Sequence, residues 1–338
     1  MISHFSAASV VKHAFGRIVA AQDLNAARLD DLCKAFDIPR RYTTADEIFG
    51  DSEVDAVYIA VPNKFHAPLA IQALLAGKHV ILDKPFAFSL EEAKEVAAAA
   101  KKSGKTFFLG MNQRFVRDHQ KIRTLATDGT LGDIYHAKAW WFRRSGIPKF
   151  GTWFCDKEMA GGGCLYDIGV HLLDLCLYVM DNFKPVSVSG STYTKFGNRG
   201  LGEGSWGISD RQGETFDVDD FATAMIKFKN GASMSLDVSW ACHAAEKDRM
   251  DVQLYGTDGG ARLNPAKLYR NRGTSSEYMV VQDLEKPIEF EHCDRFANFI
   301  NHLMGKEDLG VTIEQALVVQ MILDGIAESA QTGHEVRF

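Results

Sequence analysis

The sequence lacks the features of several protein classes. It has no Cys-x-x-Cys pair, and its six cysteines have no regular spacing, which argues against a metal site and fits a reducing compartment. No apolar run approaches the ~20 residues that a membrane-spanning helix needs. The first residues also lack the basic and apolar segments of an export signal. We therefore expect a cytoplasmic protein with no membrane partner.

An excess of positive charge is also missing. The net charge is −6 and the Lys and Arg residues are not clustered, so nucleic acid is not an expected partner. A composition of 46% hydrophobic and 24% charged residues is that of a folded globular protein. Because 338 residues exceed one ordinary core, we expect two domains.

Residues 1–122 alternate short apolar runs with helical patterns, which predicts βαβ units and a parallel sheet of the dinucleotide-binding kind. We expect strands over Arg17–Gln22, Ala56–Ala60, His79–Leu82 and Thr106–Met111. We expect helices over Ser3–Phe15, Asn25–Phe36, Phe65–Ala76, Ser89–Ala100 and Val116–Thr127.

Residues 123–338 have longer and more alternating strands, which predicts a second, α/β domain with an open and mainly antiparallel sheet. The expected strands are Tyr135–Phe142, Val186–Tyr193, Phe221–Phe228, Ala232–Trp240 and Met250–Leu254. Asn230-Gly231 indicates a type I′ hairpin turn. One helix is expected near Gly169–Val179, residues 195–213 read as a long loop, and the C-terminal helices are expected to return toward the first domain.

Polar side chains follow the expected parallel strands at their carboxyl ends, where open parallel sheets bind ligands. Each of them alone is ordinary turn chemistry. Together they indicate one crevice, because the strand ends carry Asp23, Asn63, Asp83, Lys84 and Asn112.

The glycine-rich turn that usually follows the first strand of a dinucleotide-binding domain is not found. The only G-x-G-x-x-G is Gly202–Gly207, in a polar loop of the second half, and we reject it as a cofactor motif. Asp23 ends the strand Arg17–Gln22, where an acid would hold the adenosine ribose and favour NAD over NADP; alternatively, it caps the next helix. Counting backwards, the first strand and the glycine turn would lie upstream of Met1, so we expect a truncated chain or a start that was assigned late.

A second polar group lies in the run from Gly161 to Asp174. Asp167 and His171 are four residues apart, which places them on one face of a helix. A carboxylate beside an imidazole orients the ring and raises its pKa, which makes His171 a candidate proton carrier. The alternative is a structural hydrogen bond, and a metal site lacks a third ligand.

These motifs resemble the Gfo/Idh/MocA family of nicotinamide-dependent oxidoreductases. The resemblance rests on Pro62-Asn63-x-x-His66, Asp83-Lys84-Pro85, Asn112-Gln113-Arg114 and the run from Gly162 to Asp174, in that order. The chain departs from the family in the missing glycine turn and in Asp83, where the family usually has Glu. The resemblance implies a Rossmann domain followed by an α/β domain whose open sheet commonly forms the dimer interface, hence a homodimer or homotetramer.

The residues and the resemblance together predict the site. The expected catalytic residues are Lys84, Asp167 and His171. The expected cofactor contacts are Asp23, Pro62, Asn63, His66, Asp83, Lys84, Asn112 and Arg114. The expected substrate contacts are Lys84, Trp153, Asp167 and His171, with Trp140, Trp141, Arg143 and Arg144 as further pocket candidates, although alternate members of that run would face opposite sides of the sheet.

The expected reaction is hydride transfer between NAD and a hydroxyl-bearing carbon of a sugar, cyclitol or related polyol. Two alternatives stay open. One is a glycosidase of the same family that uses its cofactor without net redox change. The other is a non-catalytic member that is impaired by the missing strand.

Overall fold

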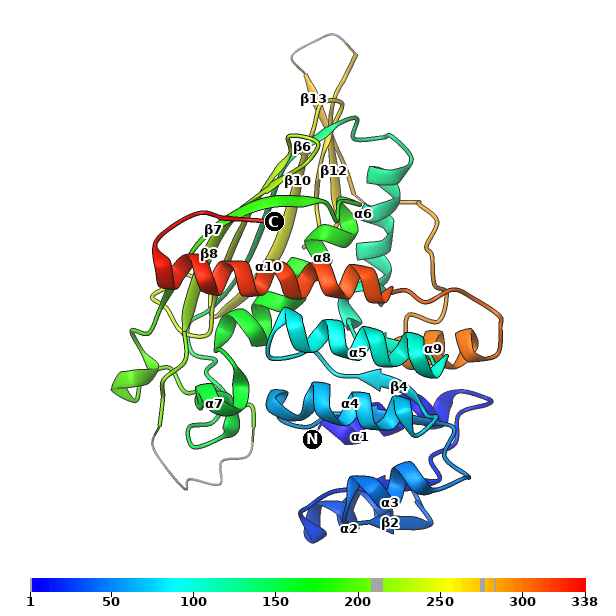
Figure 1. Ribbon diagram of the computed structural model, residues 1–338. Coiled ribbons are helices and arrows are strands. Elements are labelled where there is room, and N and C mark those ends of the chain that lie inside the picture. Colours follow the sequence, from blue (N-terminus) through cyan, green and yellow to red (C-terminus); the bar gives the residue numbers. More distant parts are fainter. Residues whose placement is uncertain (1, 208–214, 274–276, 283) are drawn as a thin grey trace. The chain divides into compact units, whose positions relative to one another are not determined.

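The computed structural model describes residues 2–207, 215–273, 277–282 and 284–338, and the chain forms two compact units (Figure 1). Unit 1 comprises Met1–Met111 and His292–Glu314, and unit 2 comprises Asn112–Glu291 and Gln315–Phe338. The chain therefore leaves unit 1 after Met111, comes back to it for the short segment His292–Glu314, and ends in unit 2.

Unit 1 is built on short parallel strands, as predicted. They form two separate sheets, β1 with β2 and β3 with β4 and β5, and no pairing joins β1 to β3 among the described residues. The strands are β1 Ala20–Gln22, β2 Arg40–Tyr42, β3 Ala56–Ile59, β4 His79–Leu82 and β5 Phe107–Leu109. The helices are α1 Ile2–Lys12, α2 Ala26–Ala35, α3 Ala45–Gly50, α4 His66–Leu75, α5 Leu90–Ser103 and α9 Arg295–Leu303, with a 3₁₀ turn η1 at Asn63–Phe65.

Local signals set several of these boundaries. The Ser89 hydroxyl accepts the Glu92 N–H at the start of α5, and Gly104 ends that helix with a φ of +68°. Thr44 and Glu47 form a capping box at α3. Helix α3 and strand β2 were not predicted, because six and three residues carry too little periodicity to reveal a helix or a strand.

Unit 2 contains one nine-stranded sheet in the order β13-β12-β11-β10-β6-β9-β8-β7-β14. Within the described part of this sheet, only the β6–β9 pairing is parallel, so the prediction of a mainly antiparallel sheet is confirmed. The strands are β6 Ile134–Arg143, β7 Pro185–Tyr193, β8 Phe221–Phe228, β9 Ser233–Ser239, β10 Asp248–Gly256, β11 Gly260–Arg262, β12 Lys267–Asn271, β13 Tyr278–Val281 and β14 Val336–Arg337.

Helices of unit 2 cover one face of this sheet, with α6, α8 and α10 visible along it in Figure 1. Gly190 of β7 lets α10 approach closely, since a Cβ there would lie 2.8 Å from the Ile326 side chain. The helical elements are η2 Asn112–Phe115, α6 Arg117–Thr127, η3 Trp153–Cys155, α7 Lys157–Ala160, the π-helical turn η4 Leu165–Gly169, α8 Val170–Val179, η5 Gly197–Arg199 and α10 Ile313–Thr332.

Two sequence expectations about unit 2 need correction. The helical run Lys157–Val179 is long and apolar enough to span a membrane, contrary to the expectation, but 89% of its apolar window is buried inside the structure, as in a core helix. The β8–β9 turn is not type I′, because only Gly231 (φ +86°) has a positive φ, and Asn230 does not. Its Gly231 N–H···O Phe228 bond instead fits a type I turn followed by a glycine bulge.

Two further expectations concern the loop 195–213 and the motif Gly202–Gly207 within it. The expected loop 195–213 lies partly outside the described residues. Residues 202–207 form bends and one isolated bridge, between Glu203 and Ile147, rather than a strand-to-helix turn. This supports the rejection of Gly202–Gly207 as a cofactor motif.

Candidate functional site

The carboxyl end of β4 carries Asp83, Lys84 and Pro85, and a buried histidine holds this corner in place. His66, only 1% exposed, opens α4. Its Nδ1 lies 2.7 Å from the Pro85 carbonyl oxygen and its Nε2 lies 3.0 Å from the Val61 carbonyl oxygen. Burial lowers the pKa of His66. The motifs Pro62–His66 and Asp83–Pro85 are thus joined through one ring, and Lys84 itself is half-exposed.

Both oxygens of the Asp83 carboxylate are bound within unit 1. Arg295 Nη1 donates to Oδ1 at 2.8 Å, and the Tyr58 hydroxyl donates to Oδ2 at 2.9 Å. Burial alone would raise the pKa of Asp83, but the positive charges of Arg295 and Lys84 outweigh it and the pKa is lowered. The Asp83 carboxylate is therefore ionised, and each of its two oxygens accepts a hydrogen bond.

The other predicted cofactor residues of unit 1 occupy strand ends. Asp23 directly follows β1 and is half-exposed, and its Oδ1 accepts the Asn25 N–H at 2.8 Å. Asn25, not Asp23, is the N-cap of α2, because its side chain accepts the Arg28 N–H. The capping alternative for Asp23 is therefore not what the structure shows. Pro62 precedes η1, and Asn63 within it is 5% exposed.

In unit 2 the helical run from Gly162 to Met180 has two side chains that reach the surface. Every other described residue of that run is buried, whereas Asp167 and His171 are half-exposed. Asp167 lies in the π-helical turn η4 and His171 in the first turn of α8. Such π-turns often occur at functional sites. Two ionisable groups standing out from an otherwise apolar, buried helix point to a site and not to packing.

Asp219 fixes the start of this run. Its Oδ1 accepts the Gly163 N–H at 2.7 Å, and its Oδ2 accepts the Leu165 N–H at 2.9 Å. These are amides of a helix start, where a carboxylate is stabilised by unpaired N–H groups. Gly163 must be glycine here, because a Cβ would lie 1.9 Å from the Asp219 carbonyl oxygen.

Two tryptophans contact the catalytic candidates. Trp240, which is fully buried just after β9, donates its indole N–H to Asp167 Oδ2 at 2.9 Å. The Trp141 ring of β6 lies 6.4 Å from the His171 ring, and Arg143 stacks over that indole at 4.5 Å. Trp140, the preceding residue of the strand, instead lies near Lys138. The expected alternation of this run across the sheet is therefore present.

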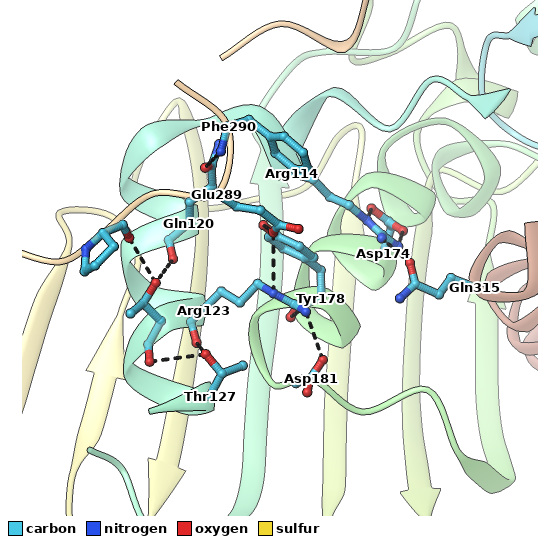
Figure 2. A network of polar contacts seen from close by, with 12 residues as sticks. Arg114, Gln120, Arg123, Thr127, Asp174, Tyr178, Asp181, Glu289, Phe290 and Gln315 are labelled. Carbon is cyan, nitrogen blue, oxygen red and sulfur yellow. Dashed lines mark hydrogen bonds and ion pairs between the residues drawn. The ribbon is translucent and has the colours of Figure 1, made fainter. Parts of the chain in front are cut away.

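Arg114, predicted as a cofactor contact, is completely buried beside α8 (Figure 2). Its Nε and Nη2 donate to the two carboxylate oxygens of Asp174 at 2.9 and 2.5 Å, and its Nη1 donates to Gln315 Oε1 at 2.5 Å. Asp174 is 1% exposed and lies three residues after His171. This buried ion pair connects η2 to α8. A cofactor contact of Arg114 stays a prediction.

The remaining predicted residues are more exposed. Asn112 is exposed at the start of η2, and Trp153 is half-buried, with its ring stacked on Phe154 at 3.8 Å. Lys84 belongs to unit 1, whereas Asp167 and His171 belong to unit 2, and their cooperation stays a prediction. The sequence analysis missed Arg295, Tyr58, Asp219 and Trp240, which touch the site residues from distant positions in the chain.

Each of the two units matches a known protein-family model. Residues 1–111 match the model of an oxidoreductase family with an NAD-binding Rossmann fold, and residues 119–262 match the GFO/IDH/MocA C-terminal domain. The first of these matches confirms NAD as the predicted cofactor.

Individual relatives act on sugars by name. D-glucoside 3-dehydrogenase of Escherichia coli (strain K12) is 35% identical over 284 residues, which are 83% of this chain and 79% of that protein. A putative UDP-kanosamine synthase oxidoreductase subunit of Amycolatopsis mediterranei (strain S699) is 35% identical over 252 residues, 75% of this chain and 69% of that protein. A solved levoglucosan dehydrogenase, in complex with NADH and levoglucosan, has the same fold, with a TM-score of 0.83 at 20% identity, covering 99% of this chain and 95% of that one.

Two described side chains of unit 1 are of the kinds that bind the adenosine and nicotinamide parts of NAD. Asp23 presents a half-exposed carboxylate after β1, suited to the ribose diol, and Lys84 presents a half-exposed amine after β4. No G-x-G-x-x-G turn follows a strand in the described part of this unit.

Proposed function

Because the chain belongs to the Gfo/Idh/MocA family of oxidoreductases, we propose that it oxidises a hydroxyl-bearing carbon of a sugar with NAD as the hydride acceptor. The observation that carries this proposal is the pair Asp167 and His171, which alone reach the surface from the buried run Gly162–Met180. D-glucosides are the first substrates to test, given the 35% identical relative. Cyclitols and other polyols follow.

His171 takes the hydroxyl proton as the carbon is oxidised, and Asp167 orients the imidazole and stabilises its charged form. Asp167 can do this with constant geometry, because Trp240 holds its Oδ2 from a fully buried position. Lys84, from unit 1, donates to the same substrate oxygen and stabilises its developing negative charge. NAD supplies the electron-pair acceptor, so the protein needs only to position groups and move one proton.

Other residues of the two units would hold the cofactor and the substrate. Asp23 would hold the adenosine ribose, and its carboxylate would repel a 2′-phosphate, which favours NAD over NADP. Trp153 offers a half-buried ring surface for a sugar face. Trp141, beside His171, offers another.

The test is NADH formation, measured by absorbance, with a panel of D-glucosides, levoglucosan and inositols. Lys84→Ala and His171→Asn are each expected to lower kcat by about 10²- to 10⁴-fold. Lys34→Ala on the exposed surface of α2 and His136→Asn on β6 are the matched controls and should retain wild-type rates. Turnover that survives the loss of Lys84 or His171 would refute the assignment, and phenol release from an aryl glycoside without added NAD would assign a glycosidase instead.

We also propose that the sheet face opposite α8 joins two copies of the chain. Its strands carry partly exposed aromatic rings in mutual contact, with Phe142 and Phe221 stacked at 5.8 Å and Tyr193 at 6.0 Å from Phe221. Light scattering after gel filtration should give a dimer or tetramer. The variant Phe221→Lys should shift it toward the monomer, and a wild-type protein that is monomeric would refute the proposal.

A further inference from the structure

Arg295, the first residue of α9, links three parallel strands of unit 1 near their carboxyl ends. Its Nη1 donates to Asp83 Oδ1 at 2.8 Å and to the Gly110 carbonyl oxygen at 2.5 Å, after β4 and β5 respectively. Its Nη2 donates to the Tyr58 hydroxyl of β3 at 3.3 Å. Gly110 makes room for this, since a Cβ there would lie 2.7 Å from the guanidinium.

Asp83 thereby becomes part of a closed set of hydrogen bonds. The Tyr58 hydroxyl oxygen accepts a hydrogen bond from Arg295, and the same hydroxyl donates to Asp83 Oδ2 at 2.9 Å. The side chains of Arg295 and Asp83 are only 11% and 16% exposed, so water screens the pair weakly. The Arg295 charge therefore compensates the Asp83 charge where they meet.

This compensation matters because the next residue is Lys84. A carboxylate with no guanidinium on it attracts any neighbouring ammonium, and weak screening strengthens that attraction. An ammonium held by Asp83 would be drawn away from a substrate oxygen. The short side chain of Asp83 keeps the carboxylate close to the strand end, where Arg295 reaches it.

We propose that Arg295 is a positioning residue for Lys84: it shares the Asp83 carboxylate, so that this acid attracts the Lys84 ammonium less strongly than it would without the guanidinium. The proposal rests on the proposed dehydrogenase function for its catalytic consequence. Its electrostatic part stands on the geometry of unit 1 and can be tested without substrate or cofactor.

The first test measures how fast the Lys84 amine is acetylated by acetic anhydride in the full-length protein without NAD, using peptide mass spectrometry. Arg295→Gln is expected to lower this rate about tenfold, because an uncompensated carboxylate holds the amine in its unreactive charged form. The double variant Asp83→Asn/Arg295→Gln is expected to restore the rate. Near-UV circular dichroism checks folding; if Arg295→Gln does not fold, Tyr58→Phe should lower the rate in the same direction.

A matched control exists in the same unit. Arg40 donates to Asp51 at 2.9 and 2.7 Å, and the Tyr42 hydroxyl donates to the same carboxylate at 3.0 Å, which reproduces the Arg–Asp–Tyr set away from Lys84. Arg40→Gln should leave the acetylation rate of Lys84 unchanged. A rate that falls equally in Arg40→Gln, or that the double variant does not restore, overturns the proposal.

The second test uses turnover. Arg295→Gln is expected to lower kcat by up to about 100-fold with little change in the KM for the sugar, and the double variant should recover part of the loss. A change confined to KM overturns the positioning role. If acetylation responds as expected but no sugar is oxidised by the wild type, the proposed function fails and the electrostatic inference stands.

Discussion

The ion pair between Arg114 and Asp174 gives the sharpest stability prediction. Both side chains are 1% exposed, and the carboxylate takes two hydrogen bonds from the guanidinium, at 2.9 and 2.5 Å. Asp174→Asn keeps the shape of the side chain but removes its charge. The Arg114 charge would then remain buried without the carboxylate that accepts two of its hydrogen bonds.

Removing one partner of a buried ion pair costs about 3–5 kcal/mol, because the remaining charge is desolvated without compensation. For a domain of about 200 residues, each kcal/mol lowers the melting temperature by about 2–4 °C. We therefore expect the unit 2 transition of Asp174→Asn to melt about 6–20 °C below that of the wild type. The rings of Tyr178 and Phe183, at 5.2 and 5.3 Å from the guanidinium, offset only part of the loss.

Differential scanning calorimetry resolves the transitions, and Figure 2 shows the matched control close by. Arg123 pairs with Asp181 at 3.1 Å, but these side chains are 22% and 53% exposed. Asp181→Asn should cost at most about 1 kcal/mol, since water screens that pair. Equal melting temperatures for the Asp174 and Asp181 variants would refute the reasoning. The double variant Arg114→Met/Asp174→Leu should melt above Asp174→Asn, because no buried charge is left unpaired.

Three further outcomes are expected. Gly163→Ala should destabilise unit 2 by more than about 3 kcal/mol, since backbone blocks its Cβ, whereas Gly50→Ala, with open space, should be neutral or stabilising in urea unfolding. The lowered pKa of Asp83 means that its stabilising effect is present above the unfolded value of about 3.9 and is lost as pH falls further, so Asp83→Asn should flatten the acid limb of a urea-midpoint titration. A thiol reagent should modify Cys242 and Cys293 quickly and the four buried cysteines only on unfolding; fast modification of all six would contradict the structure.

The order of strands and helices could be predicted where the sequence period is long enough to be unambiguous. The predicted strand His79–Leu82 has the same bounds as β4, because its run of four residues ends at the polar pair Asp83-Lys84. Strand β2 and helix α3 were missed, since they are too short to show a period. The hairpin turn was misassigned because Asn-Gly is compatible with two turn types, and the backbone of the whole β8–β9 pair decides between them.

For the site, the motifs predicted which residues stand near strand and helix ends but not what holds them. Asp83 was expected at a cofactor, yet a guanidinium 212 positions away binds it, and no local pattern reveals such a contact. Arg114 was expected in the crevice, yet Asp174 of the second motif binds it in the interior. Both motifs were recognised, but their mutual pairing depends on tertiary packing.

The central claim is that a ring carbon of a sugar gives up its hydrogen directly to NAD while His171 takes the hydroxyl proton. The most direct measurement uses methyl glucosides that are each deuterated at one ring carbon, and mass spectrometry of the reduced cofactor. The account predicts NADH that carries one deuterium from one of these glucosides, formed at an initial rate that is far lower in His171→Asn. Reduced cofactor without deuterium from any deuterated position, or no reduction across the sugar panel, would contradict it.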